Sequence, residues 1–169
     1  MAAAKPLPTQ ERLRELFDYD EATGLLLWRR RDDIGPGFNG RFAGKRAGSL
    51  SDRYWRVMVD HRNFTYHRVI WKFVYGTEPS SEIDHINGDT SDNRIANLRE
   101  GDRWLNAKNR SPTRGRSLPK GVRLQKYCKN YQAYIVRQRL GYFSTPEEAH
   151  AAYLKAAKEQ WGEWVRTED

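Results

Sequence analysis

The chain contains a single cysteine, Cys128, and lacks any long run of apolar residues. One cysteine excludes an internal disulfide and a cysteine-rich zinc site, so any bound metal must have oxygen or nitrogen ligands. The longest apolar stretches are a handful of residues, whereas a membrane-spanning helix needs about 20. The N-terminal segment also lacks the apolar core of a signal peptide. We therefore expect a cytoplasmic protein that is not secreted, contacts no membrane and has no disulfide-linked partner.

Acidic residues are missing from a long stretch in the second half of the chain. Between Arg103 and Pro146 there is no Asp or Glu, although the whole chain carries a net charge of +8. Such a balance favours a polyanionic partner, with nucleic acid ahead of an acidic membrane. A charge run is often only a solvated face, but this one crosses at least two predicted elements and a linker. We therefore expect a nucleic-acid contact surface. Its basic residues are Arg103, Lys108, Arg110, Arg114, Arg116, Lys120, Arg123, Lys126, Lys129, Arg137 and Arg139.

Apolar residues are also few, at 38% of the chain, and the mean hydropathy is −0.92. Aromatic residues nevertheless reach 12%, which argues against disorder because disordered chains are poor in aromatics. The length of 169 residues suits one ordinary domain or two or three small modules. We expect an α+β fold made of small modules, each with a thin core that relies on large aromatic side chains.

Apolar periodicity and turn signals predict short elements in the first half of the chain. A helix is expected over residues 9–19, capped by Thr9, and another over residues 68–75, ending at Gly76. Strands are expected at residues 25–29, 47–50, 54–59 and 64–66, with turns at residues 20–24 and 61–63. The glycine-rich segment 34–45 is expected to be a loop.

The second half is expected to hold two strands and a helix, then three strands and a helix. The first set consists of strands 82–86 and 96–99, separated by a polar turn, and a helix over 102–109 capped by Asp102. Residues 111–120 have the composition of a linker. The second set consists of strands 121–124, 131–137 and 140–143 and a helix that opens at Pro146, capped by Ser144 or Thr145. The apolar face of this helix comprises Ala149, Ala152, Tyr153, Ala156 and Ala157.

The segment 82–99 gathers side chains that carry chemistry. It places the carboxylate of Asp84 directly beside the imidazole of His85, and Asn97 and Asn106 follow. Carboxylate and amide oxygens are ligands for a hard divalent cation. Imidazole is the side chain best suited to take a proton near neutral pH. Together these groups predict an active site.

Asp84 and His85 also have purely structural interpretations, as a turn cap and as a core histidine with a satisfied hydrogen bond. The strand adds a constraint, because adjacent residues of a regular strand point to opposite faces. If both residues serve one site, the strand must twist or end at this point.

Two interpretations also stay open for the asparagines and for a second histidine. Asn97 either serves the site or closes a turn through backbone hydrogen bonds. Asn106 either serves the site or is an ordinary residue of the predicted helix, where asparagine has poor propensity. His67 either contacts phosphate or simply begins its helix. The turn residues Asp89, Asp92 and Asn93 are expected to be turn formers.

The sequence Asp-His-Ile-Asn-Gly at residues 84–88, with Asn-Arg-x-x-Asn-Leu at residues 93–98, resembles the HNH nuclease motif of phage and intron-encoded homing endonucleases. His67-Arg68 with Trp71 resembles the flanking segment of that family, and the resemblance covers roughly residues 10–110. It implies a ββα-metal finger, in which two antiparallel strands and a helix fold around one divalent cation. The implied ion is Mg²⁺, with Mn²⁺ as the alternative.

The same resemblance implies a role for each site residue. Asp84 and Asn106 bind the metal, His85 is the general base that activates water, and Asn97 orients the histidine. The implied substrate is double-stranded DNA. Other members of the wider group carry histidine at the position of Asn106, and some hold the finger together with four cysteines around zinc. Neither feature is present here, and the asparagine is similar to that of the phage subgroup.

The C-terminal segment, about residues 118–162, resembles the plant APETALA-type (ethylene-response-factor) DNA-binding domain. The resemblance is carried by Leu-Gly-Tyr-Phe-Ser-Thr-Pro-Glu-Glu-Ala at residues 140–149 and by the later Ala-x-x-Ala spacing. In that family a three-stranded sheet enters the major groove, as a β-sheet face physically can. By position, the implied DNA contacts are Arg123, Gln125, Lys126, Tyr131, Tyr134, Arg137 and Arg139. Alternation along the strand suggests that only one of the two tyrosines faces DNA.

These expectations combine into one organisation. A helix and β-rich DNA-contacting region is expected at residues 1–50, an HNH nuclease domain at 51–110, a basic linker at 111–120 and the APETALA-type domain at 121–165. The expected function is a metal-dependent endonuclease, in a bacterial host cell or encoded by a phage, that nicks double-stranded DNA. The oligomeric state is open, with a monomer slightly favoured. One site cuts one strand, so a monomer should nick, whereas a dimer could break both strands. The alternatives are a non-catalytic DNA-binding or regulatory protein that retains the nuclease fold, an RNA-directed nuclease and a phage packaging factor.

Overall fold

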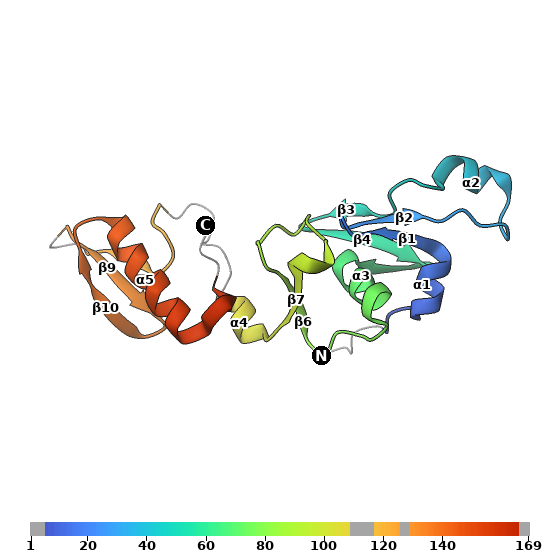
Figure 1. Ribbon diagram of the computed structural model, residues 1–169. Helices are drawn as coiled ribbons and strands as arrows, with labels where there is room; N and C mark the ends of the chain where they lie inside the picture. Colours follow the sequence, from blue (N-terminus) through green and yellow to red (C-terminus); the bar gives the residue numbers. More distant parts are fainter. Residues whose placement is uncertain (1–5, 109–116, 126–128, 166–169) are drawn as a thin grey trace. The chain divides into compact units, whose positions relative to one another are not determined.

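Helices alternate with four small antiparallel sheets along the part of the chain that the structure describes, residues 6–108, 117–125 and 129–165 (Figure 1). The structure is a computed structural model, and it confirms the expected α+β class. Its internal contacts divide the chain into two compact units, residues 1–102 and residues 103–169. The division into four parts at residues 50, 110 and 120 stays a prediction. The core of the first unit draws on residues from both sides of residue 50.

The first unit holds three sheets. Its helices are α1 (Gln10–Leu16), α2 (Pro36–Phe42) and α3 (Tyr66–Tyr75), with the short 3-10 helix η1 (Ile95–Asn97). Its strands are β1 (Phe17–Asp20), β2 (Leu25–Trp28), β3 (Ser49–Ser51), β4 (Tyr54–Val59), β5 (Arg62–Thr65), β6 (Glu82–His85) and β7 (Leu98–Gly101). They pair as β1–β2, as β3–β4–β5 and as β6–β7.

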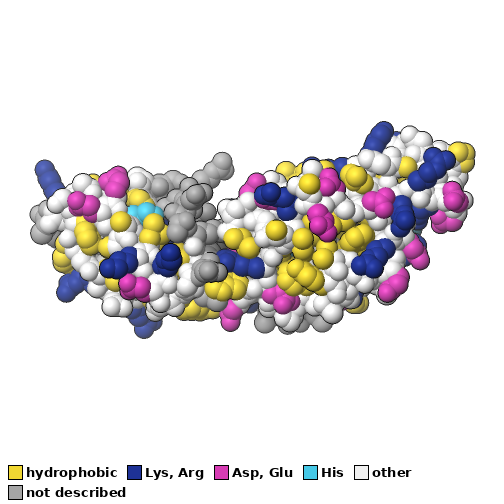
Figure 2. Space-filling model, in the orientation of Figure 1, with side chains coloured by type: hydrophobic (Ala, Val, Ile, Leu, Met, Phe, Trp, Pro, Cys, Tyr) yellow, Lys and Arg dark blue, Asp and Glu magenta, His cyan; other side chains and the backbone are white. Residues whose placement is uncertain are grey.

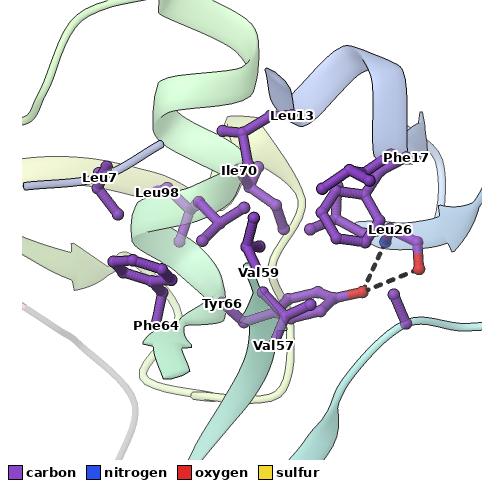
Figure 3. Packing of buried hydrophobic residues seen from close by; sticks show 13 residues of the cluster. Leu7, Leu13, Phe17, Leu26, Val57, Val59, Phe64, Tyr66, Ile70 and Leu98 are labelled. Atoms are coloured by element: carbon purple, nitrogen blue, oxygen red, sulfur yellow. Dashed lines mark hydrogen bonds between the residues drawn. The ribbon is translucent and has the colours of Figure 1, made fainter. Parts of the chain in front are cut away.

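One apolar core joins helices α1 and α3 with strands β1, β2, β4, β5 and β7 (Figure 3). Val57 and Val59 of β4 and Ile70 of α3 are at most 2% exposed, as their strand and helix periodicities require. Tyr66 is fully buried at the start of α3. Its hydroxyl accepts a hydrogen bond from the Leu26 N–H at 2.6 Å and donates one to the Leu26 carbonyl at 3.3 Å. The phenol therefore fills the core beside β2 with its polar atom paired.

Two predictions for the first unit are wrong in kind. The helix expected to reach residue 19 ends at Leu16, because residues 17–20 pair with β2 as strand β1. Leu13 and Leu16 are thus buried from the helix, whereas Phe17 is buried from the strand. The segment 34–45, expected to be a loop, contains α2, which Pro36 opens with its preset φ.

Other boundaries of the first unit differ by a residue or two. Strands β3 and β7 begin two residues later than predicted, and α3 begins two residues earlier. The turn between β4 and β5 consists of Asp60 and His61, with φ of 45° and 62°, rather than residues 61–63. Gly76 ends α3 in the left-handed conformation with φ of 74°, as predicted.

The second unit contains the predicted three-stranded sheet and its helix. Its elements are α4 (Arg103–Lys108), β8 (Val122–Leu124), β9 (Tyr131–Ile135), β10 (Gln138–Phe143), α5 (Pro146–Trp161) and the 3-10 helix η2 (Gly162–Trp164). The strands pair in the order β10–β9–β8. Strand β9 ends two residues earlier than predicted, because the chain turns at Val136, whose φ is 52°.

Helix α5 begins with a complete capping box. Thr145, rather than Ser144, is its N-cap: the Thr145 side chain accepts from the Glu148 N–H, and the Glu148 side chain returns to the Thr145 N–H. The buried residues of the helix are Ala149, Tyr153 and Ala157, all from the predicted apolar face. None of the helices in the described part of the chain is long and apolar enough to cross a membrane.

Candidate active site

Asp84 lies on β6 directly opposite Arg99 of β7. Its Oδ2 accepts a hydrogen bond from Arg99 Nη2 at 3.1 Å, and only 14% and 16% of the two side chains are exposed. A charge-assisted bond in such a sheltered place fixes the orientation of the carboxylate and offsets part of its charge. Asp84 is therefore an anionic oxygen donor in a defined position on the sheet.

His85 is the last residue of β6 and is 3% exposed. The strand ends there, as two adjacent site residues require, and the Gly88 N–H donates to the His85 carbonyl at 3.0 Å in the turn that follows. His85 Nε2 lies 3.3 Å from Asn93 Oδ1. The Asn93 amide is oriented by its Nδ2, which donates to the Ser91 carbonyl at 3.0 Å. Because an amide oxygen only accepts, this contact favours the proton on Nε2 and the lone pair on Nδ1.

Two further rings from other elements surround His85. His67 of α3 meets it edge to face, with centroids 5.4 Å apart and planes at 89°. Tyr54 of β4 lies 5.4 Å from the His67 ring and 6.4 Å from the His85 ring, and it is 40% exposed. Burial, and then the charges of His85 and Arg68, lower the pKa of His67 from 6.5 to about 3. His67 is therefore a neutral ring packed on the candidate base, and its contact with phosphate stays a prediction.

Asn97 closes the loop between β6 and η1. Its Nδ2 donates to Asn87 Oδ1 at 2.9 Å and to the Asp92 carbonyl at 2.8 Å, and its Oδ1 accepts from the Asn87 N–H at 3.0 Å. Its backbone carbonyl accepts from the Ile86 N–H at 2.8 Å. These bonds match the turn-closing interpretation of Asn97. Any orientation of the histidine by Asn97 thus acts through this loop, and that role stays a prediction.

The other polar residues of the loop are turn formers, as expected. Asp89 Oδ1 accepts from both the backbone N–H and the hydroxyl of Ser91, at 2.8 and 2.7 Å. Asp92 accepts two bonds from the Arg94 guanidinium, at 2.8 and 2.6 Å. The Arg94 guanidinium holds the pKa of Asp92 at about 2. Asp92 therefore stays ionised and keeps this part of the loop fixed at neutral pH.

The β1–β2 hairpin supports the loop from the other side. The Tyr19 hydroxyl donates to the Asn93 carbonyl at 3.3 Å and accepts from the Ile95 N–H at 2.8 Å. Gly24, with φ of 70°, packs so closely that a Cβ there would lie 2.4 Å from the backbone nitrogen of Arg94. The residues that the sequence resemblance assigns to a nuclease site thus depend on a hairpin more than 60 residues earlier in the chain.

Asn106 lies in α4, which belongs to the second compact unit. Along the chain, β6, β7 and α4 follow in the ββα order that the resemblance implies. The role of Asn106 as a metal ligand stays a prediction. Arg103 and Lys108 are the end residues of the same helix. The remaining linker cations Arg110, Arg114 and Arg116, together with Lys126, lie outside the described residues, and Lys120 stands just before β8.

The C-terminal sheet resolves the alternation of its tyrosines. Tyr131 packs against the core cluster of Val122, Ala133 and Ala149, so its predicted contact with DNA has no support from its position. Tyr134 lies on the opposite face of β9, where the Arg123 guanidinium is 5.3 Å from its ring centroid.

Gln132 organises the same face of that sheet. It is 3% exposed, and its Oε1 accepts bonds from Arg123 Nε at 2.6 Å and from Gln125 Nε2 at 2.9 Å. Arg139 lies over Tyr142 at 5.6 Å, and Arg137 is exposed in the β9–β10 turn. The side chains of two predicted DNA contacts, Arg123 and Gln125, therefore share one acceptor, Gln132, which is not among the predicted contacts.

Two residues around His85 are absent from the predicted site. Asn93 is predicted only as a turn former, yet its side chain meets the candidate base. A signal was available, because Asn93 opens the Asn-Arg-x-x-Asn motif itself. Tyr54 carries no such signal, since its approach to His67 and His85 follows from the packing of β4 beside α3.

Comparison with known families gives one match. Residues 65–108, from the end of β5 through α4, match the model of a family described as HNH endonuclease. The match supports a DNA nuclease at the level of the family and covers Asp84, His85, Asn93, Asn97 and Asn106. Neither the curated proteins nor the solved structures compared with this chain give a match.

Proposed function

We propose that this protein is a metal-dependent HNH endonuclease that hydrolyses phosphodiester bonds in double-stranded DNA and nicks one strand per site. The observation that carries the proposal is the His85 geometry inside the segment that matches the HNH endonuclease family. There a buried imidazole ends a strand beside Asp84 and contacts an oriented amide at 3.3 Å. A base held in one tautomer beside a carboxylate is what activation of water requires.

His85 takes the proton in this proposal. The amide of Asn93 holds the proton on Nε2, so Nδ1 is the nitrogen that accepts a proton from the attacking water. Tyr54 and His67 restrict the ring by packing, and the neutral state of His67 avoids a second positive charge beside the base. Asn97 contributes indirectly by closing the loop that carries Asn93.

The residues proposed to hold a divalent cation fit it chemically. Asp84 offers a carboxylate in a fixed orientation, and Asn106 offers a neutral amide oxygen. Oxygen donors suit Mg²⁺, with Mn²⁺ as the alternative, and disfavour soft metals. Among the described residues, no group of three or more His, Cys, Asp or Glu side chains forms a metal site. When bound, the cation would stabilise charge on the phosphate and the leaving oxygen.

The C-terminal sheet is proposed as the DNA-binding module, similar to the APETALA type. Its contacts would come from Arg123, Gln125, Arg137 and Arg139, with Tyr134 taking the place proposed for Tyr131. The basic residues between the two modules, Arg103 to Lys120, would add phosphate contacts that position the protein without reading sequence. Joining two modest DNA contacts raises affinity through effective concentration. This arrangement, with a single nuclease site, is consistent with the homing type and with a phage origin.

Cleavage of supercoiled plasmid tests the function. Wild-type protein with Mg²⁺ should convert plasmid to the nicked form, and EDTA should abolish this. His85→Ala should lower the rate by at least about a hundredfold, the usual contribution of a general base. His61→Asn changes an exposed histidine of the β4–β5 turn and should cut normally.

Asn93→Ala tests the amide that contacts His85. It should lower the cleavage rate while binding of DNA persists, because it frees the His85 ring. A protein that binds duplex DNA but cuts under no divalent metal would instead be the non-catalytic DNA-binding alternative. Preferential cutting of RNA would favour the RNA-directed nuclease.

A further inference from the structure

A basic segment of the first unit connects β2 to β3 and contains none of the proposed catalytic residues. We name it the 29–46 arm after its residues (Figure 1). It carries six basic residues and only two acidic ones, Asp32 and Asp33. The basic residues are Arg29, Arg30, Arg31, Arg41, Lys45 and Arg46. Figure 2 shows Lys and Arg side chains gathered on this end of the first unit. The arm lies outside the acid-free stretch but within residues 1–50, the region expected to contact DNA without any named contact residue.

The arm has a defined structure, although α2 within it has no buried residue. At its base, the Gly44 N–H donates to the Trp28 carbonyl at 2.8 Å. The Phe38 ring meets Trp28 edge to face at 5.5 Å and Phe42 at 4.9 Å. The side chain of Asn39 accepts from the Arg31 N–H at 3.1 Å and donates to the Arg31 carbonyl at 2.6 Å. These contacts hold one side of α2 and fix the positions of its neighbouring cations.

The opposite side of α2 is bare backbone. At 100° per residue, Gly37 and Gly40 lie on the side away from Phe38 and Phe42, and Arg41 lies beside Gly37. A Cβ on either glycine would meet no atom within 4 Å, and neither glycine has a positive φ. Glycine is a poor helix former, so neither intramolecular packing nor backbone conformation explains these two. Glycine in such a place permits close approach by an external partner.

Most of the cations on the arm are available to that partner. Arg30, Arg41 and Lys45 are exposed, and in the described part of the chain no carboxylate lies within ion-pair distance of them. The Arg41 guanidinium lies 5.2 Å from the centroid of the Phe42 ring, a contact that leaves its charge without an anionic partner. Arg29 lies 3.7 Å from Asp18, but both side chains are more than half exposed, so this pair holds the arginine weakly. A recess of about 450 Å³ beside the arm has both charges in its lining, which consists of Arg12, Arg29, Arg30, Arg31, Glu15, Asp32 and Asp33. Bare glycine backbone beside Arg41, with Arg30 and Lys45 exposed on the same arm, fits a phosphate backbone.

We propose that the 29–46 arm is a second DNA-contact element, which lays the Gly37–Gly40 side of α2 against the sugar–phosphate backbone of the duplex. Arg30, Arg41 and Lys45 pair with phosphates there. The presence of a polyanionic partner follows from the arm itself, whereas its identity as duplex DNA rests on the proposed function. Contacts of this kind add affinity and position the nuclease unit without reading sequence.

Binding measurements in a His85→Ala background test the charges, because cleavage then plays no part in the readout. Affinity for a duplex of about 30 base pairs is measured across salt concentrations for Arg30→Gln/Arg41→Gln. The control Lys155→Gln/Lys158→Gln removes the same charge from exposed positions of α5. Two lost phosphate contacts should lower the slope of log K against log salt by about 1.8 and the affinity by about tenfold or more. Equal losses in the two double variants would overturn the proposal.

A size series at the glycines tests the close approach. Gly37→Ala and Gly40→Ala, then Gly37→Gln and Gly40→Gln, add bulk where no protein atom lies. The melting temperature should not fall, because helix propensity rises. Affinity for duplex DNA should fall as the side chain grows. Unchanged affinity in the glutamine variants would overturn the contact that places α2 on the backbone.

Hydrogen exchange on the His85→Ala protein gives an independent readout. Duplex DNA should protect the backbone amides of residues 29–46 from exchange, and the absence of protection would overturn the proposal. This measurement needs no substitution in the arm, so it stands even if an arm variant fails to fold. Duplex RNA and vesicles of anionic lipid are compared with DNA, and stronger arm-dependent binding to either would overturn the choice of partner. If the wild-type protein does not nick plasmid but its binding to DNA still depends on the arm, the proposed nuclease is refuted and the arm remains a DNA contact.

Discussion

The buried histidine His67 should make the first unit lose stability as the pH falls below neutrality. Its ring is 9% exposed and packs edge to face on His85, and burial lowers its pKa from 6.5 to about 3. In the unfolded chain the ordinary value applies. Below pH 6.5 the unfolded state therefore binds a proton that the folded state takes up only near pH 3.

The sign and size of the effect follow from which state holds the proton. Above pH 6.5 the contribution of neutral His67 to stability is complete, and it is lost as the pH falls toward 3. The loss accumulates across this window and amounts to about 3 kcal/mol at a pH of about 4.5. Against the total stability of roughly 5–15 kcal/mol typical of domains, this loss is large.

Urea unfolding of wild type and His67→Phe, followed by tryptophan fluorescence, measures the effect. Phenylalanine keeps a ring against His85 and Tyr54 but has no nitrogen to titrate. Between about pH 7.5 and pH 4.5, the difference in unfolding free energy should move by about 2–3 kcal/mol in favour of the variant. Other groups titrate in both proteins, so the difference isolates His67.

His61→Asn is the matched control. His61 is exposed in the β4–β5 turn with φ of 62°, a conformation that asparagine tolerates. This variant should follow the wild-type pH dependence. If His67→Phe also followed it, within about 0.5 kcal/mol, burial would not be holding His67 neutral and the reasoning would be refuted.

Three further substitutions probe the framework. Tyr66→Phe removes the hydroxyl that pairs with the N–H and the carbonyl of Leu26. The unfolding free energy should fall by about 1–3 kcal/mol in urea titrations. Only a simultaneous gain elsewhere in the core could mask this loss. Gly24→Ala forces a Cβ to 2.4 Å from the Arg94 backbone nitrogen, so both the melting temperature and plasmid nicking should fall together; loss of neither would show that the hairpin does not support the loop. Thr145→Ala should cost about 1 kcal/mol of stability, most of which Thr145→Ser should restore, as measured by calorimetry.

The order of strands and helix in the second unit could be predicted from the sequence, because the residues that indicate it lie close together in the chain. Pro146 after Thr145 and the alanine-rich face belong to one helix, and each kept its predicted role. The capping partner Glu148 is a further finding of the structure. The end of α1 was not readable, because Leu16 and Phe17 are equally apolar and only the pairing with β2 converts residue 17 to a strand. The glycines of α2 predict a loop, and a helix forms there because Phe38 packs on Trp28 and Phe42 packs on Phe38.

The candidate site divides in the same way. Asp84 and His85 are predicted by residue type and adjacency, and the family match at residues 65–108 includes both. The contact between Asn93 and His85 depends on how the loop folds back, which in turn depends on Tyr19 and Gly24.

By itself, the sequence determined the chemistry on offer: a carboxylate beside an imidazole, amide groups at motif spacing, no cysteine ligand set and a strongly basic balance. These are properties of residue types and short spacings, which a chain keeps whatever its fold. Only the tertiary structure decided which amide meets His85, that His67 is buried and neutral, and that α2 exposes its glycines on the side away from its phenylalanines. Each of these depends on desolvation and on contacts between segments distant in the chain, and residue spacing does not encode either directly.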